Sequence, residues 1–310
     1  MGRERVAVLL PAYDEEGAIA KVVGDFRAAL PDAAIYVYDN NSRDSTIEAA
    51  RAAGAIVRIE PQQGKGHVVR RMFADIDADI FILCDADDTY EATAAPAMAA
   101  RLRDENLDLI TGVRISDQKE AYRPGHRFGN RMLTGMVRMI FGDRAKDMLS
   151  GYRVMSRRFV KSFPALSRGF EIETELTVHA LELQLPMADH DTAYSERAEG
   201  TESKLSTFRD GARIGAKILT LVKDERPLPF FSLVALGLVL LALVIATPRL
   251  IEFLNTGLFP FVGTAVLATG LVMVGVISLA TGLILSTVTQ GRREMKRLAY
   301  LRHAAPGDDQ

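Results

Sequence analysis

Three aspartates lie within four positions at the end of an apolar run, in the stretch FILCDADDTY at residues 81–90. Asp85 and Asp87 form a D-x-D pair, and Asp88 follows directly. Hard divalent ions such as Mg²⁺ or Mn²⁺ bind one or two carboxylates and complete their coordination with water and phosphate oxygens. The pair therefore predicts a metal site that a diphosphate completes. A solvated acidic turn is the alternative, but it does not explain acids at the end of a central apolar strand.

Two further stretches carry side chains suited to a nucleoside, PAYDEEG at 11–17 and DNNSRDST at 39–46. Asp39 is able to accept a hydrogen bond from a nucleobase ring N–H, and Asn40 and Asn41 offer donors and acceptors for a base edge or a ribose. The alternative for Asn41 is to cap the helix that follows.

A fourth polar stretch, QQGKGH at 62–67, is suited to a phosphate. Gly64 and Gly66 allow close backbone approach, and Lys65 supplies a positive charge. As a phosphate motif G-K-G is weak, because it lacks the longer spacing of a P-loop.

The elements that position these residues alternate along the first half of the chain. We expect strands at about 5–10, 35–38, 55–59, 80–84 and 107–113. We expect helices at about 18–30, 45–53, 68–75 and 94–103. This order predicts an α/β fold with a mainly parallel sheet covered by helices on both faces. Ligands bind beyond the carboxyl ends of such strands, so the four polar stretches should meet at one edge.

Two long segments near the C-terminus, 228–246 and 255–290, contain no charged residue. Each supplies the roughly 20 apolar residues that cross a bilayer. We therefore expect two transmembrane helices joined by a loop at 247–255. The alternative, a buried hairpin of a soluble core, would keep a polar stripe.

This pattern divides the chain into three parts. We expect a catalytic domain at 1–225, a transmembrane hairpin at 226–290 and a basic cytoplasmic tail at 291–310. Lys and Arg flank the spans on their outer ends, and by the positive-inside tendency both termini lie in the cytoplasm. The expected location is therefore the inner (cytoplasmic) membrane, as a multi-pass protein.

Composition narrows the function classes further. The net charge of −2 argues against a general nucleic-acid binder. The single cysteine, Cys84, excludes an intramolecular disulfide and fits a reducing compartment. The N-terminus offers no apolar stretch long enough for a signal peptide.

Two segments outside the predicted spans have the pattern of helices lying at a membrane surface. Residues 122–141 place apolar side chains at four-residue steps with arginines among them, and residues 205–222 lead into the first span. An amphipathic core helix is an equally weighted alternative for the first segment. Arginine grips phosphate bidentately, so the candidates for donor or acceptor phosphate contacts are Arg114, Arg127, Arg131 and Arg197.

The motifs PAYDEEG, DNNSRDST, GKGH and the strand followed by DAD are followed by SGYRVMSRR and ERAEGTESKLS. In this order, over essentially the whole chain, they resemble glycosyltransferase family 2. The likeness is to the branch of dolichyl-phosphate mannosyltransferase-like polyprenyl-phosphate glycosyltransferases with two C-terminal membrane helices. It implies a GT-A fold, a nucleotide-sugar donor, Mg²⁺ or Mn²⁺ and a polyprenyl phosphate acceptor. It also implies that a homo-oligomer could form through the membrane helices.

The resemblance assigns roles residue by residue. The nucleoside would lie against Pro11, Ala12, Tyr13, Glu15 and Asp39. The metal and diphosphate would lie at Asp85, Ala86 and Asp87. Phosphates near the acceptor would face Arg197, Ser203 and Lys204. Three positions depart from the family: Asn40 and Asn41 lie in Asp39-Asn40-Asn41-Ser42 where D-D-G-S is common, and Thr89 stands where Gln is common.

The expected reaction depends on the acceptor. A phosphate oxygen is already ionised near neutral pH and needs no strong base, whereas a hydroxyl acceptor requires a carboxylate base. Glu171, Glu173 and Glu175 are candidates for that base, although at most one or two should reach the site. Asp88 either orients its loop or acts as the base.

The function favoured by these features is inverting transfer of a single sugar from a UDP- or GDP-sugar to a polyprenyl phosphate at the cytoplasmic membrane face. The alternatives are transfer to a lipid or glycan hydroxyl, or a noncatalytic membrane subunit that binds sugar nucleotides.

Overall fold

The computed structural model describes residues 4–115, 146–169, 171–195, 223–258 and 262–306. Contacts divide the chain into two compact units, Met1–Thr207 with Met295–Gln310, and Phe208–Glu294. The predicted surface helices at 122–141 and 205–222 lie outside the described residues.

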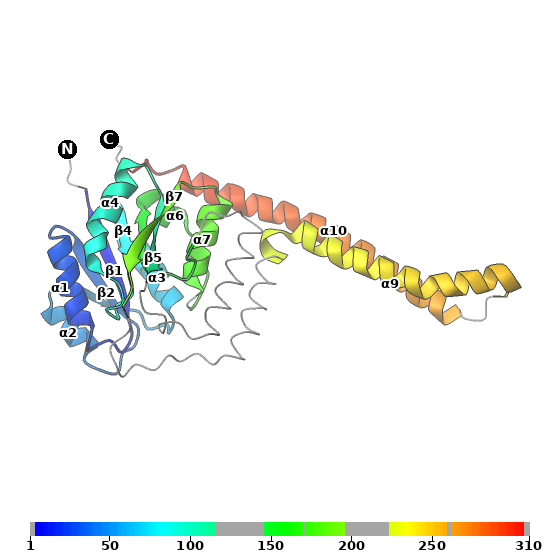
Figure 1. The fold of residues 1–310 in the computed structure, drawn as a ribbon, viewed down its shortest axis with the longest axis horizontal. Coiled ribbons are helices and arrows are strands. Elements are labelled where there is room, and N and C mark those ends of the chain that lie inside the picture. Colours follow the sequence, from blue (N-terminus) through cyan, green and yellow to red (C-terminus); the bar gives the residue numbers. More distant parts are fainter. Residues whose placement is uncertain (1–3, 116–145, 170, 196–222, 259–261, 307–310) are drawn as a thin grey trace. The chain divides into compact units, whose positions relative to one another are not determined.

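The first unit is built on a seven-stranded sheet (Figure 1). The strands are β1 (Val6–Ala12), β2 (Ala34–Asp39), β3 (Ile56–Ile59), β4 (Ile80–Leu83), β5 (Leu109–Ile115), β6 (Arg153–Ser156) and β7 (Met187–Ala193). Their order is β3-β2-β1-β4-β6-β5-β7. Four of the six pairings are parallel, and only β6 runs antiparallel to its neighbours β4 and β5. The prediction of a mainly parallel sheet is confirmed.

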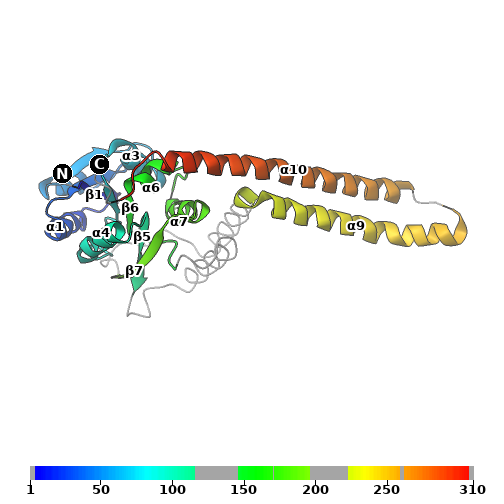
Figure 2. The same ribbon diagram turned by 90° about the horizontal axis from the view of Figure 1, so that it is seen from above.

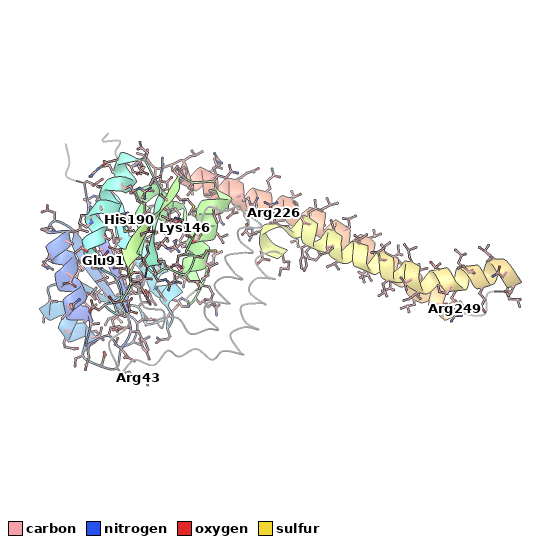
Figure 3. All side chains as sticks on the ribbon, in the orientation of Figure 1. Arg43, Glu91, Lys146, His190, Arg226 and Arg249 are labelled. Atoms are coloured by element: carbon pink, nitrogen blue, oxygen red, sulfur yellow. The ribbon has the colours of Figure 1, made fainter. Side chains whose placement is uncertain are left out.

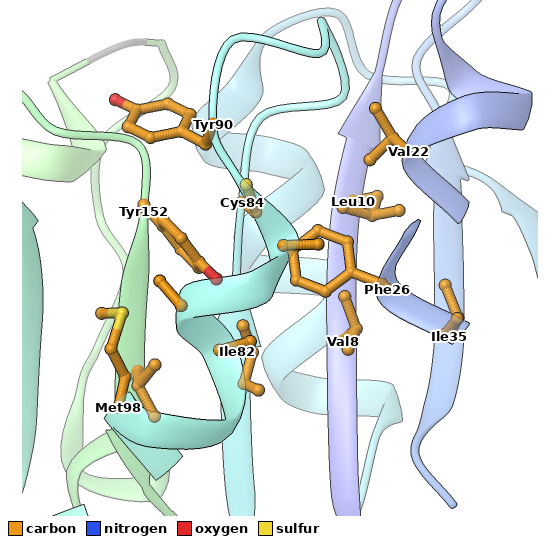
Figure 4. Close-up of a cluster of buried hydrophobic side chains, with 14 of the residues drawn as sticks. Val8, Leu10, Val22, Phe26, Ile35, Ile82, Cys84, Tyr90, Met98 and Tyr152 are labelled. Carbon is orange, nitrogen blue, oxygen red and sulfur yellow. The ribbon is translucent and has the colours of Figure 1, made fainter. Parts of the chain in front are cut away.

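Helices cover both faces of this sheet. They are α1 (Ile19–Ala29), α2 (Thr46–Ala52), α3 (Lys65–Asp75), η1 (Ala92–Ala94), α4 (Ala95–Asp104), α6 (Arg157–Ser162) and α7 (Ile172–Glu182). Side chains alternate between faces along a strand, so the core forms two layers. Val8 and Ile82 pack in one layer with Phe26 of α1 and Met98 of α4 (Figure 4). Leu9 packs in the other layer, with side chains of α3, α6 and α7.

The strand β6 is not predicted from the sequence. Its sequence is RVMS, so it shows neither the apolar run that marks β4 nor the alternation by which a half-buried strand is recognised. Ser156 ends it and begins α6, because its side chain accepts a hydrogen bond from the Phe159 N–H.

The second unit contains α9 (Pro227–Thr256) and most of α10 (Val262–Tyr300), which run side by side in both views (Figure 2). Both helices are long and apolar enough to cross a membrane, judged by their length and composition. The prediction of two apolar C-terminal helices is confirmed.

The predicted loop at 247–255 is wrong, because α9 continues to Thr256. Gly257 ends the helix in the left-handed conformation, with φ 70°, and its N–H donates to the Phe253 carbonyl. Arg249, labelled in Figure 3, pairs with Glu252 at 3.0 Å within this last part of α9. The end of the charge-free run therefore does not mark the end of the helix.

The two apolar helices meet through small residues. The buried positions of α10 recur every seven residues, and they are Ala268, Gly275, Gly282 and Thr289. A Cβ at Gly282 would lie 2.9 Å from the Phe231 Cβ of α9. Small residues at such an interface allow two helix backbones to approach closely.

The predicted tail at 291–310 is not a separate segment, because α10 continues to Tyr300 and Met295–Gln310 belongs to the first unit. Lys296 Nζ lies 2.6 Å from the Glu182 carboxylate of α7. The Tyr300 hydroxyl donates to Asp108 at 2.8 Å. The basic C-terminal residues therefore make contacts within the first unit.

Candidate active site

The loops after β1 and β2 are fastened together by hydrogen bonds from backbone N–H groups to side chains. Asp14 N donates to Ser42 Oγ at 2.9 Å, and Arg43 N donates back to Asp14 Oδ1 at 2.7 Å. Glu15 N donates to Thr46 Oγ1 at 2.8 Å. These bonds join the loops that contain PAYDEEG and DNNSRDST, and they place Tyr13 and Glu15 near the end of β2.

Asp39 is the last residue of β2 and is 1% exposed. Its Oδ2 accepts a hydrogen bond from Ser42 N at 3.1 Å, whereas its Oδ1 is buried and has no hydrogen-bond partner among the described residues. A buried acceptor without a partner costs about 1–3 kcal/mol. Ala12 lies opposite Asp39 in the β1–β2 register, and Pro11 precedes it. A nucleobase N–H would satisfy the Asp39 oxygen, so these residues fit a nucleoside.

The two asparagines of DNNS hold the loop that follows β3. Asn40 Nδ2 donates to the carbonyls of Glu60 and Gln62, each at 2.8 Å, and its Oδ1 accepts from Gly64 N at 2.7 Å. Asn41 Nδ2 donates to the Pro61 carbonyl at 2.9 Å.

The backbone of Asn41 explains one departure from the family pattern. Its φ is 66°, in the left-handed region that glycine favours and that asparagine tolerates better than most residues. Asn41 therefore fits at the glycine position of the D-D-G-S pattern that the resemblance led us to expect. The cap residue of α2 is Ser45, so Asn41 does not take the alternative capping role.

Each of the three clustered aspartates has its own partner. Asp85 forms an ion pair with Lys65. Asp87 Oδ1 accepts from Thr89 Oγ1 at 2.6 Å. Asp88, whose φ is 59°, pairs with Lys21 of α1 at 2.6 Å. These separate partners relieve the like-charge repulsion that the sequence suggests. Thr89, at the position where the resemblance led us to expect Gln, orients the second aspartate of the pair.

Lys65 begins α3 and is nearly enclosed, with a side chain 9% exposed. Its ammonium pairs with both Asp85 and Glu173. Burial alone would lower the pKa of Lys65, but the two carboxylates outweigh it and raise that pKa above its ordinary value. The group therefore stays charged, directly beside one aspartate of the D-x-D pair.

The glycines flanking Lys65 allow close backbone approach, but the neighbour in the described structure is protein. A Cβ at Gly64 would overlap the Arg168 carbonyl, and one at Gly66 would overlap the Ser167 carbonyl. Gly66 N donates to the Arg168 carbonyl at 3.2 Å. The loop before α7 therefore fixes the position of Lys65.

The sequence does not reveal the roles of Gly151 and Arg153, although both belong to the SGYRVMSRR motif. A Cβ at Gly151 would overlap the Asp85 carboxylate, so only glycine leaves room there. Arg153 is fully buried and donates to Thr111 Oγ1 at 2.6 Å and to the Met148 carbonyl at 3.0 Å. It fixes the loop that carries Gly151 against the acid pair.

Arg114, predicted to contact phosphate, forms a bidentate pair with Asp147 at 2.7 and 2.8 Å and lies over the Tyr194 ring. Its phosphate contact stays a prediction. The other predicted contacts lie outside the described residues, and they are Arg127, Arg131, Arg197, Ser203 and Lys204.

The three candidate bases at the start of α7 occupy different environments, and the first of them, Glu171, is the residue before the helix. Glu173 is 4% exposed and pairs with Lys65. Glu175 accepts from Leu166 N at 3.0 Å and from Ser167 N at 2.8 Å. Glu171 is half-buried. Two of the three candidate bases are therefore engaged within the protein.

The acid pair fits a metal that requires further ligands. Among the described residues, no group of three or more His, Cys, Asp or Glu side chains could hold a metal ion. Asp85 and Asp87 supply hard oxygen donors, which suit Mg²⁺ or Mn²⁺ when a diphosphate and water complete the coordination. Two carboxylates and a diphosphate were the donor set expected from the sequence.

Comparison with solved structures defines the class of fold as GT-A. Glucosyl-3-phosphoglycerate synthase of Mycobacterium tuberculosis superposes with a TM-score of 0.57 and 24% identity, over 71% of this chain and 80% of that chain. A structure of that synthase with Mn²⁺ and UDP-glucose gives a TM-score of 0.58 and 23% identity, over 71% and 79%. The predicted fold class is confirmed.

The family follows from sequence. Residues 7–163 match the model of glycosyl transferase family 2. Glycosyltransferase AglJ of Haloferax volcanii is 34% identical over 311 residues, covering 96% of this chain and 98% of that protein. A dolichyl-phosphate hexose transferase of the same organism is 28% identical over 221 residues, covering 71% and 95%. The chain belongs to glycosyltransferase family 2 and is a glycosyltransferase.

Proposed function

We propose that this glycosyltransferase moves a single sugar from a UDP- or GDP-sugar to a polyprenyl phosphate, with inversion at the anomeric carbon, at the cytoplasmic face of the inner membrane. The partly unsatisfied Asp39 carboxylate supports a nucleotide donor, because both uracil and guanine present a ring N–H. Pro11, Ala12, Tyr13 and Glu15 would complete the nucleoside contacts, together with Asn41.

The metal and diphosphate would lie at Asp85, Ala86 and Asp87. When bound, Mg²⁺ or Mn²⁺ would stabilise the negative charge of the departing nucleoside diphosphate. Thr89 holds the Asp87 carboxylate in one orientation. Lys65 brings a second positive charge beside Asp85. Gly151 leaves room for the Asp85 carboxylate. The similar synthase has been solved with Mn²⁺ and UDP-glucose, which supports this use of the site.

The observation that carries the acceptor assignment is the engagement of Glu173 and Glu175 within the protein. A hydroxyl acceptor would need a carboxylate free to take its proton, whereas an ionised phosphate needs only to be positioned. Asp88 also has a partner, because it pairs with Lys21. The two apolar helices and the dolichyl-phosphate hexose transferase relative support a lipid carrier for that phosphate.

Arginine, lysine and serine side chains would contact the acceptor or donor phosphates. These proposed contacts are Arg114, Arg127, Arg131, Arg197, Ser203 and Lys204. In the described structure the Arg114 guanidinium lies between the Asp147 carboxylate and the Tyr194 ring. A phosphate would therefore have to share Arg114 with Asp147 or displace it.

A comparison of two lipid acceptors, each supplied separately, tests the proposal. The full-length protein in detergent, with Mn²⁺ and a panel of UDP- and GDP-sugars, receives either a polyprenyl phosphate or the polyprenol of the same length. Release of nucleoside diphosphate with the phosphate alone is expected. Release with the alcohol alone would contradict the proposal and favour a hydroxyl acceptor. Donor binding without release for any lipid would favour a noncatalytic subunit.

A further inference from the structure

Glu173 is a buried acid behind the proposed metal–diphosphate site. It lies in the first turn of α7, and its carboxylate is 5% exposed. One oxygen pairs with the Lys65 ammonium, and the other, Oε2, has no hydrogen-bond partner among the described residues. Lys65 therefore bridges two acids, Asp85 at the sheet edge and Glu173 behind it.

The surrounding loops keep Lys65 in this bridge. Gly64 and Gly66 on either side of it pack against the backbone of Ser167 and Arg168. That loop is in turn held by Glu175, which accepts hydrogen bonds from Leu166 N and Ser167 N. With its backbone fixed on both sides, the Lys65 ammonium has little freedom to leave the two carboxylates.

This arrangement creates a competition for Asp85. A divalent ion at the acid pair needs the same carboxylate that Lys65 contacts. If Asp85 were the sole partner of Lys65, binding of the ion would leave a buried ammonium without a compensating charge, which is strongly unfavourable. Glu173 supplies a second carboxylate, so Lys65 keeps a partner when the ion takes Asp85.

We propose that Glu173 is a positioning residue, which anchors Lys65 so that Asp85 is available to the metal ion and the ammonium stays beside the diphosphate. This inference rests on the metal–diphosphate site of the proposed function. It does not depend on which sugar is transferred or on which acceptor receives it.

Glu173→Gln tests the inference, because it removes the charge and keeps the shape. Glu182→Gln is the matched control. Glu182 lies on the same helix, is 2% exposed at its side chain and pairs with Lys296 at 2.6 Å within the same unit. Both variants lose a buried ion pair, so both should lower the melting temperature followed by circular dichroism.

Only the first variant should change metal binding. The Kd for Mn²⁺ alone, followed by the electron paramagnetic resonance signal of the free ion, should rise about tenfold in Glu173→Gln, which is the range for residues that orient a metal ligand. It should stay unchanged in Glu182→Gln. An unchanged Kd in Glu173→Gln, or an equal rise in both variants, would overturn the inference.

A second pair of variants, made with Lys65 replaced, distinguishes an effect of Glu173 on metal binding through Lys65 from a direct effect. In Lys65→Met the competitor for Asp85 is gone and Glu173 is left as a buried, unpaired charge. Adding Glu173→Gln should then raise the melting temperature and leave the Kd for Mn²⁺ unchanged. A further tenfold weakening in this background would overturn the inference, because Glu173 would then act without Lys65.

These readouts use neither a sugar donor nor a lipid. The expected Mn²⁺ pattern together with no sugar transfer would count against the proposed function alone. Normal transfer together with an unchanged Kd in Glu173→Gln would count against this inference alone.

Discussion

Buried aspartates lie at both ends of the parallel strands, here called the amino edge and the carboxyl edge of the sheet, and their surroundings differ. Asp108 precedes β5 at the amino edge, where both of its oxygens accept hydrogen bonds, from Ser156, twice from Arg158 and from Tyr300. Asp39 ends β2 at the carboxyl edge, where one oxygen has no partner among the described residues. A carboxylate that the protein satisfies completely stabilises the fold. One left partly unsatisfied is suited to a ligand.

Closely packed glycines are a further feature of the carboxyl edge. Gly64 and Gly151 lie where a Cβ would overlap neighbouring atoms. Residues of positive φ do not distinguish the edges, because Asn41 and Asp88 lie at the carboxyl edge and Asn106 and Gln184 lie shortly before β5 and β7. The comparison predicts that substitutions at the carboxyl edge change catalysis and binding, whereas substitutions at the amino edge change stability.

The largest effect is expected for Asp87→Asn at the carboxyl edge. The neutral amide keeps the shape but would bind the divalent ion more weakly, and that ion stabilises the departing diphosphate, so turnover should fall by about 10²–10³-fold. The rate of nucleoside diphosphate release measures the loss, and the melting temperature should stay close to that of the unaltered protein. A large drop in melting temperature with normal turnover would contradict this prediction, because Asp87 would then serve stability and not catalysis.

Asp108→Ala should have the opposite signature. It leaves Arg158, whose side chain is 14% exposed, without its carboxylate. Removing one partner of a buried pair costs about 3–5 kcal/mol of unfolding free energy. Urea unfolding followed by circular dichroism measures this cost, and Kd values for UDP and GDP should not change in the folded fraction. If the variant were as stable as the parent, Asp108 would not contribute to the stability of the fold, and the prediction would be wrong.

Low pH should reduce the stability of the fold through His179 of α7. Burial lowers the pKa of this imidazole to about 3, against an ordinary value near 6.5. The unfolded chain therefore binds the proton first, and stability is lost as the pH falls from about 6.5 towards 3. At pH 5 the loss should be about 2 kcal/mol. His179→Gln should flatten this dependence in urea titrations at several pH values, and an unchanged slope would contradict the assignment.

Asp88→Asn should have the smallest effect. Its partner Lys21 is 61% exposed at the side chain, and pairs of this kind contribute about 0–1 kcal/mol. Turnover should stay within about threefold of the parent, equivalent to less than 1 kcal/mol. A loss as large as that of Asp87→Asn would identify Asp88 as a base and favour a hydroxyl acceptor.

The sequence predicts much of the carboxyl edge, because its first four strands are largely apolar and are followed within a few residues by acids, amides or glycine. The predicted bounds of the first five strands differ from the observed ones by one or two residues. The conformation of Asn41 also follows from its place in a turn motif that usually contains glycine.

The contacts that complete the site could not be predicted in this way. Lys65 and Glu173 are far apart in the chain, and only the packing of α3 against α7 brings their charges together. The same holds for Asp108 and Tyr300, which are 192 positions apart. The strands β6 and β7 were missed because their sequences, RVMS and MADHDTA, contain neither an apolar run nor a regular alternation.

Isothermal titration of UDP and GDP, each with Mn²⁺, into the full-length protein and its Asp39→Asn variant tests the central comparison most directly. One nucleotide should bind the parent, and the variant should bind it about tenfold more weakly or worse, since an amide cannot match the charge-assisted hydrogen bond of a carboxylate. The two proteins should melt at similar temperatures. Equal affinity in both proteins would contradict the account, because the unsatisfied Asp39 oxygen would then not serve the nucleotide.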